Sequence, residues 1–329
     1  MRFQILFLLL LLFLSISTVS AQIDDPITVD SSIIRLNVGV ADAKGSPITN
    51  LTRQNFTIYE DGVRQDITRF EPSAAPFSVV MMLDMSGSTK SFRQNIQLAA
   101  SRFIDALAPD DRVAVIEFYD KINLRNNFTT DRKTIRHSIS VANGQGDTNF
   151  YKALSFALEK LVKEGKRRKA IVVLTDGIDT QAQNQDRIKL NSLSNESEVP
   201  SAIKPEQYDN LNQVLNQADR LGVTIYPLAL PTGDPKRLAD PSPKQFAMYD
   251  AARSRMKILA DRTGGTLNAI NKLEDMGRLY AVVAAELRTL YTVEYQSTND
   301  KRDGKWRVIK IEINNPDLIP KTRQGYFAK

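Results

Sequence analysis

The spacing of apolar and polar residues predicts a small β unit near the start of the chain. Apolar and polar residues alternate from Ile34 to Val40, and this period of two is typical of a strand with one buried face. Two further runs of this kind, 56–59 and 63–70, flank Asp61-Gly62, a dipeptide that favours a tight hairpin. The Pro-, Ser- and Ala-containing segment 71–76 is then expected to be a linker.

The pattern changes at Phe77, where strands and helices begin to alternate. Residues 77–83 are almost all apolar, as expected for a strand that is covered on both faces. We expect further strands at 112–118, 122–128, 170–174, 223–230 and 266–270, and helices at 96–107, 149–163, 247–262 and from Leu273 to Leu287. This order predicts an α/β fold with a doubly wound, mostly parallel, Rossmann-like sheet.

The end of the chain returns to β character. Residues 291–296 and 306–313 are expected to form two strands, which would be marginally stable alone. We therefore predict that they pack with the strands of 33–70, so that both flanks build a second, smaller antiparallel β domain. The predicted organisation is a signal peptide at 1–21, an N-terminal β unit at 22–76, a central domain at 77–290 and C-terminal β strands at 291–329.

The first residues are typical of a secretory signal. Arg2 precedes an apolar run from Ile5 to Ile16, and small residues lead up to a cleavage site after Ala21. The alternative is an uncleaved anchor, but the apolar run is short for a bilayer core of roughly 30 Å. We expect a secreted or periplasmic protein with no membrane span after signal cleavage.

Composition and charge exclude several kinds of function. The 329-residue chain contains no Cys, which excludes disulfides, thiol catalysis and Cys-based zinc sites. Its net charge of +6, lowered by one when Arg2 is removed, could suit anionic polymers or a membrane surface. The densest basic run, residues 166–169, directly precedes an apolar strand. We interpret it as a solvated loop and not as a nucleic-acid patch.

Polar residues follow the ends of two buried strands and also occur in a loop between them. They form the segments Asp84-Met85-Ser86-Gly87-Ser88-Thr89, Gly146-Asp147-Thr148 and Thr175-Asp176-Gly177. Loops at the carboxyl ends of strands in such a sheet gather at one crevice. There Asp84 and Asp176 would supply carboxylates, and Ser86, Ser88 and Thr148 hydroxyls. These hard oxygen donors suit Mg²⁺ or Mn²⁺. The alternative is that the acids cap strand ends and the serines are ordinary turn residues.

The three-part motif resembles the metal-ion-dependent adhesion site (MIDAS) of von Willebrand factor A (VWA) domains, and the strand–helix order is similar over roughly 77–290. The flanks are similar to secreted bacterial "VWFA-related" proteins, in the segments Leu51-x-x-x-Asn55-Phe56, Tyr59-Glu60-Asp61-Gly62 and Arg323-Gln324-Gly325-Tyr326.

The resemblance implies a role for each residue of the motif. Ser86 and Ser88 would coordinate the cation through their hydroxyls, and Thr148 directly or through water. Asp84 and Asp176 would hold coordinated waters. An Asp or Glu of a protein partner would complete the shell, which makes the chain an interaction or adhesion module with no catalytic residues.

Other functions fit the sequence less well. The single His, His137, lies in a polar helical stretch, and the chain has no Gly-x-Ser-x-Gly motif for a serine hydrolase. Asn149 replaces the third glycine of a dinucleotide loop. A metal-assisted hydrolase and an anionic-polymer or surface binder remain as alternatives. The segments 180–205 and 231–245 are expected to be long loops beside the crevice, which either set partner choice or are mobile filler.

Overall fold

The computed structural model describes residues 33–270 and 275–328. The signal peptide predicted at 1–21, its cleavage site after Ala21 and the start of the last predicted helix at Leu273 lie outside these residues. Within the described ranges, no helix combines the length and hydropathy that a membrane span requires.

The centre of the fold is a six-stranded sheet in the order β10-β9-β8-β5-β6-β7. Its strands are β5 (Phe77–Asp84), β6 (Arg112–Phe118), β7 (Ile122–Thr129), β8 (Arg168–Thr175), β9 (Thr224–Ala229) and β10 (Asn268–Ala269). Neighbouring strands are parallel except β7, which is antiparallel to β6. Every residue of β5 and β8 is buried. The prediction of a doubly wound, mostly parallel sheet is confirmed.

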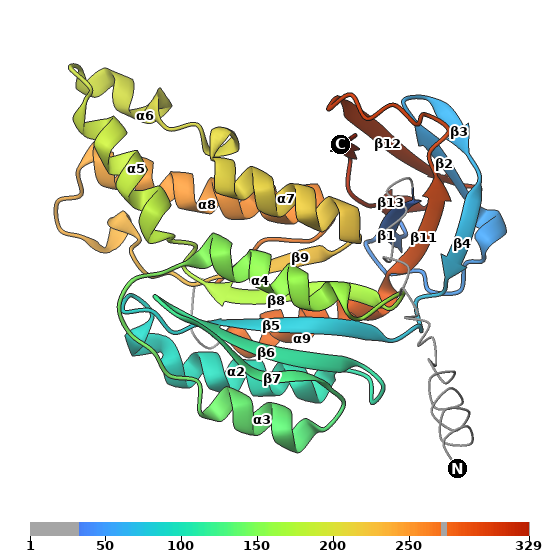
Figure 1. Cartoon of the computed structure of the whole chain (residues 1–329), viewed down its shortest axis with the longest axis horizontal. Coiled ribbons are helices and arrows are strands. Elements are labelled where there is room, and N and C mark those ends of the chain that lie inside the picture. Colours follow the sequence, from blue (N-terminus) through green and yellow to red (C-terminus); the bar gives the residue numbers. More distant parts are fainter. Residues whose placement is uncertain (1–32, 271–274, 329) are drawn as a thin grey trace, which may run out of the picture. The chain divides into compact units, whose positions relative to one another are not determined.

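Helices cover both faces of this sheet (Figure 1). One face packs against α2 (Arg93–Ala106), α3 (Arg132–Ser140) and α9 (Met276–Thr289), and the other against α4 (Phe150–Val162), α7 (Asp209–Leu221) and α8 (Pro243–Thr263). Successive residues of β5 alternate between the two cores: Met81 belongs to the first and Met82 to the second. This two-sided burial explains why the strands are continuously apolar in sequence.

The two flanks of the chain form antiparallel sheets together. One sheet has the order β13-β1-β11-β4 and the other β14-β12-β2-β3. The strands are β1 (Ile33–Ala41), β2 (Phe56–Glu60), β3 (Val63–Gln65), β4 (Ile67–Glu71), β11 (Tyr291–Gln296), β12 (Trp306–Ile313), β13 (Ile319–Lys321) and β14 (Gly325–Phe327). β11 pairs with both β1 and β4, and β12 pairs with β2. The flanks therefore share one core, while the domain boundaries at 76/77 and 290/291 stay a prediction.

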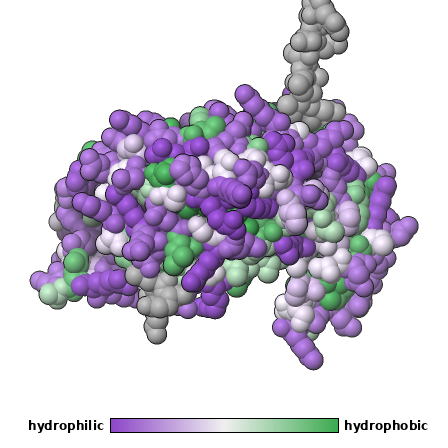
Figure 2. Space-filling view, turned by 90° about the horizontal axis from the view of Figure 1, so that it is seen from below, coloured by the Kyte–Doolittle hydropathy of each residue, from purple (hydrophilic) through white to green (hydrophobic). Residues whose placement is uncertain are grey.

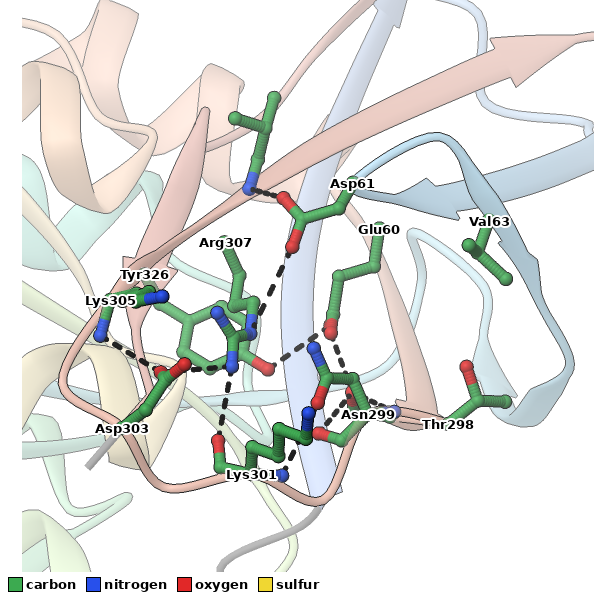
Figure 3. A network of polar contacts seen from close by, with 12 residues as sticks. Glu60, Asp61, Val63, Thr298, Asn299, Lys301, Asp303, Lys305, Arg307 and Tyr326 are labelled. Carbon is green, nitrogen blue, oxygen red and sulfur yellow. Dashed lines mark hydrogen bonds and ion pairs between the residues drawn. The ribbon is translucent and has the colours of Figure 1, made fainter.

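A buried carboxylate connects these two sheets. Glu60, at the end of β2, is 2% exposed and accepts hydrogen bonds from the hydroxyls of Tyr295 (2.7 Å), Tyr326 (3.0 Å) and Ser297 (2.5 Å). The neighbouring Asp61 has a positive φ of 49° and accepts a bond from the Val308 backbone N–H at 2.8 Å (Figure 3). Glu60 thus has a structural role in joining the two sheets, whereas Asp61 attaches the β2–β3 turn to β12 of the same sheet.

The segment 180–205 is mostly helical, so its prediction as a long loop is wrong. It contains α5 (Thr180–Asn191), a 3₁₀ turn (Glu196–Glu198), α6 (Val199–Ala202) and the start of a second 3₁₀ turn (Pro205–Gln207). The Asp179 side chain caps α5 by accepting a bond from the Ala182 N–H at 3.0 Å. The segment 231–245 contains a 3₁₀ turn (Pro235–Arg237) before α8 begins. Further 3₁₀ turns of three residues occur at Arg53–Asn55 and Lys90–Phe92.

The basic run 166–169 is not a solvated loop, because its second half is buried. Arg168 is 0% exposed and Lys169 is 3% exposed, and both belong to β8. The Arg168 guanidinium donates to the carbonyls of Pro72 (3.1 Å), Ser73 (2.8 Å) and Leu287 (2.8 Å). Backbone carbonyls supplied by the linker and by the end of α9 therefore replace water around this charge.

The surface shown in Figure 2 is mostly hydrophilic, with hydrophobic residues in separate patches. The large apolar side chains exposed in the described ranges come from many different elements: Ile33, Val63, Leu98, Val141, Val162, Ile188, Leu238, Val282, Val308, Ile319 and Phe327. Isolated exposed apolar residues are normal in soluble domains and do not by themselves indicate a partner.

Candidate metal site

The structure brings the three predicted segments together at the carboxyl ends of β5 and β8. The Gly87 N–H donates to the Gly146 carbonyl at 3.0 Å, which joins the first segment to the second. The Thr148 N–H donates to Thr180 Oγ1 at 2.9 Å, and the Thr180 N–H donates to the Thr148 carbonyl at 3.0 Å. These bonds join the second segment to the first residue of α5, the helix that follows Asp176.

Asp84 is the last residue of β5 and is completely buried. Its Oδ1 accepts bonds from the Ser86 N–H (3.0 Å) and Ser86 Oγ (2.6 Å), and its Oδ2 accepts a bond from Thr175 Oγ1 (2.6 Å). Burial, and next the negative charge of Asp176, raise the pKa of Asp84 to about 7, although the hydrogen bonds from Ser86 and Thr175 oppose this rise. The two acids are therefore close enough to repel each other.

Asp176 directly follows β8 and is 1% exposed. Its Oδ1 accepts a bond from the Ile178 N–H at 3.0 Å, and its Oδ2 accepts one from Thr232 Oγ1 at 2.8 Å. Thr232 lies beyond the end of β9 and was not predicted as a site residue. The only signal for it in the sequence is its place shortly after an apolar strand.

Two of the three predicted hydroxyl ligands lie side by side. Ser86 Oγ and Ser88 Oγ are 3.2 Å apart. Ser86 is 1% exposed and Thr148 is 5% exposed, whereas Ser88 is exposed to solvent. The buried Ser86 hydroxyl therefore lies beside the Ser88 hydroxyl, which solvent or a ligand can reach.

Two residues that were not predicted hold the segment before Thr148 in place. The Arg93 guanidinium donates to the carbonyls of Met85 and Gly144, and so clamps the first segment against the loop that leads into the second. The buried Glu117 carboxylate accepts a bond from the Asn143 N–H at 2.9 Å. Both residues act on backbone atoms distant in sequence, so no local motif could have identified them.

The charge and chemistry of the cluster fit a hard cation. In the ranges 33–270 and 275–328, neither Asp84 nor Asp176 forms an ion pair with a Lys or Arg. The same residues contain no group of three or more His, Cys, Asp or Glu that could hold a metal. A cation here would therefore depend on hydroxyls and water as well as the two acids, and oxygen ligands of this kind suit Mg²⁺ or Mn²⁺. His137 is exposed on α3.

Comparisons with known proteins match this part of the chain. The family model described as von Willebrand factor type A domain matches residues 79–178. An uncharacterized protein of Synechocystis sp. is 28% identical over 125 residues, which are 37% of this chain and 30% of that protein.

Two solved structures are similar in fold. The von Willebrand factor type A protein from Catenulispora acidiphila has a TM-score of 0.47 and 13% identity, and the match covers 84% of this chain and 63% of that one. The mussel byssus protein proximal thread matrix protein 1, with a zinc-occupied MIDAS motif, has a TM-score of 0.45 and 15% identity. This match covers 68% of this chain and 49% of that one. The matches thus span less than two thirds of each of these proteins and of the Synechocystis protein.

Proposed function

The central domain of this chain belongs to the von Willebrand factor type A family, and from this premise we propose that the chain is an exported interaction module that binds a protein partner through a divalent cation. Asp84, Ser86, Ser88, Thr148 and Asp176 would hold Mg²⁺ or Mn²⁺. An acidic side chain of the partner would complete the coordination of that ion. Export is inferred from the residues before Gln22, and a non-catalytic role from the interaction and adhesion modules that this domain family forms.

One observation carries the proposal. Two almost completely buried carboxylates, Asp84 and Asp176, lie within electrostatic reach of each other and form no ion pair with any cationic side chain of the described residues. Burying uncompensated negative charge is costly, and a bound cation would offset that cost. The hydroxyls of Ser86 and Ser88 beside them are neutral ligands.

The neutral ligands explain why the partner would be acidic. If the hydroxyls contact the ion and the two carboxylates reach it through water, much of its double positive charge stays uncompensated. A carboxylate from outside is then the most favourable remaining ligand. Exposed Ser88 lies on the side from which such a group could approach.

The proposal is tested by calorimetric titration of the purified protein with MgCl₂ and MnCl₂. Asp84→Asn keeps the side-chain shape and the acceptor for Ser86 but removes the charge. We expect it to weaken cation binding about 10- to 100-fold, the usual loss when a group that orients a metal ligand is changed. Ser101→Ala is the matched control, because Ser101 bonds only its own helix, at the Gln97 carbonyl. Equal cation uptake by wild type and Asp84→Asn would contradict the proposal.

The partner side is tested by a pull-down from the envelope of source cells with and without EDTA. We expect chelation to release the bound protein. Metal-dependent turnover of a substrate, without metal-dependent binding of a protein, would favour the hydrolase instead.

A further inference from the structure

A hollow opens beside the candidate metal site, between α5 and α8. It has a volume of about 250 Å³ and reaches from Gly177 and Ile178 across to Met248, Tyr249 and Ala252. Gly177 follows Asp176 in the chain, and Gly233, which also lines the hollow, follows Thr232, whose hydroxyl bonds Asp176. Because consecutive Cα atoms are 3.8 Å apart, the hollow begins one residue from the site on two different loops. We call it the α5–α8 pocket.

The walls of the pocket are largely apolar. Ile178, Leu238, Met248 and Tyr249 line it, and Leu238 is 49% exposed at the surface. Two alanines on the facing helices, Ala182 on α5 and Ala252 on α8, leave the space between them open.

The charged groups that line the pocket already have partners within the protein, either an ion pair or hydrogen bonds. Asp186 and Arg255 form two hydrogen bonds of 2.7 Å each, and their side chains are 8% and 5% exposed. The Arg255 guanidinium also lies over the Tyr208 ring, 5.0 Å from its centre. The Asp179 carboxylate caps α5. A charged ligand group would therefore have to compete with these existing partners, whereas an apolar one would lose little on entering the pocket.

We propose that the α5–α8 pocket receives a large apolar side chain of the protein partner, such as Leu or Phe, that lies within three residues of the acidic residue bound at the metal. This inference rests on the proposed function. An extended chain advances about 3.3 Å per residue, so residues close to the acid reach the pocket rim. The metal selects only a carboxylate, and the pocket then decides which acidic sequences bind.

The test uses the full chain and a panel of fluorescein-labelled synthetic peptides, with saturating MgCl₂. Each peptide has one Asp in a Gly/Ser background and one varied position, up to three residues before or after the Asp, that holds Gly, Leu, Phe, Lys or Arg. Fluorescence anisotropy gives the Kd. We expect Leu or Phe at one of these positions to lower the Kd about tenfold or more relative to Gly, because the pocket would remove a large apolar side chain from water.

A filled pocket should remove this gain. Ala252→Phe places a ring in the space between the helices, so the Leu and Phe peptides should bind like the Gly peptide. Ala247→Phe, the same change on α8 outside the pocket lining, should keep the gain. The Gly peptide reports whether Ala252→Phe is folded, because its binding needs only the metal site.

The outcomes separate the pocket from the metal site. Magnesium-dependent binding without preference for Leu or Phe, a preference for Lys or Arg, or an unchanged preference in Ala252→Phe would each overturn the pocket while leaving the proposed function intact. If no peptide binds in a magnesium-dependent way, the proposed function fails. The neutral probe N-acetyl-leucinamide then tests whether the pocket binds an apolar side chain. NMR shifts on adding the probe, abolished in Ala252→Phe, would support the proposed pocket, and an absence of shifts would overturn it.

Discussion

Replacing the buried Arg168 by Met should destabilise the protein and weaken the connection between its β flanks and its central sheet. Arg168 begins β8, yet its guanidinium bonds the carbonyls of Pro72 and Ser73 in the linker and of Leu287 at the end of α9. It also lies over the Phe77 ring, 3.9 Å from its centre. One side chain thus ties together the points at which the chain enters and leaves the central sheet.

The size of the effect follows from two opposing contributions. Each hydrogen bond from a charged group to a buried carbonyl contributes about 1.5 to 3 kcal/mol. Burial opposes them, because it lowers the pKa of Arg168 from 12.5 to about 10, which corresponds to roughly 3 kcal/mol. Met fills similar space but leaves the three carbonyls without a donor. We expect a net loss of about 2 to 4 kcal/mol in the free energy of unfolding.

Urea unfolding followed by two probes measures this loss. Fluorescence of Trp306, the single Trp of the chain, reports on β12 in the flanking sheets. Far-ultraviolet circular dichroism reports mainly on the helices around the central sheet. Because the Arg168→Met variant loses bonds between these regions, we expect its two transitions to separate as well as to move to lower urea. Lys166→Met is the control, because Lys166 is exposed and carries the same charge. A variant Arg168→Met as stable as Lys166→Met would refute the reasoning.

Three further changes test other parts of the fold. Glu60→Ala should lower the free energy of unfolding by about 2 to 4 kcal/mol, because three hydroxyls lose their buried acceptor. Glu60→Gln should lower it less, and equal losses measured by urea unfolding would argue against a hydrogen-bonding role. Burial, and next the charge of Arg35, lower the pKa of Lys169 from 10.5 to about 8. Between pH 8 and 10.5 the unfolded chain therefore holds a proton that the folded one lacks, so stability from this group rises with pH across that window. Below pH 8, the free energy of unfolding of Lys169→Met should exceed that of wild type by about 1 to 3 kcal/mol, and this difference should disappear towards pH 10.5. A difference that does not change with pH would contradict the expectation. Gly265→Ala should lower the melting temperature, because the added Cβ would lie 2.1 Å from the Ile225 carbonyl oxygen. An unchanged melting temperature would contradict this by showing that the backbone can move away.

The central fold could be predicted because its strands are buried on both faces. Runs such as 77–83 and 170–174 are continuously apolar for this reason, and the structure has β5 and β8 there. Helix α7 was not predicted, although Leu211, Val214, Leu215 and Ala218 recur at helical spacing and are buried. Helix α5 gives a weaker signal, because only three of its residues are buried and one of them, Asp186, is charged.

The candidate site was only partly predictable. The order of the polar segments after β5 and β8 was enough to select Asp84 and Asp176, because strand ends in one sheet lie side by side. The bond from Thr232 to Asp176 and the clamp made by Arg93 depend on how distant loops approach each other. A local pattern also misled the interpretation of 166–169, since the sequence does not show that backbone carbonyls surround Arg168.

The interleaved flanks determine how a pulling force would pass through the molecule. β4 ends where the chain enters the central segment and β11 begins where it leaves, and Glu71 pairs directly with Thr292. The central segment is therefore attached like the loop of one long hairpin. Tension applied between residues 33 and 328 would first load the terminal strands β1 and β14, which pair with β11 and β12. Along the chain, the tension would reach the central segment only after β4 and β11 had also separated.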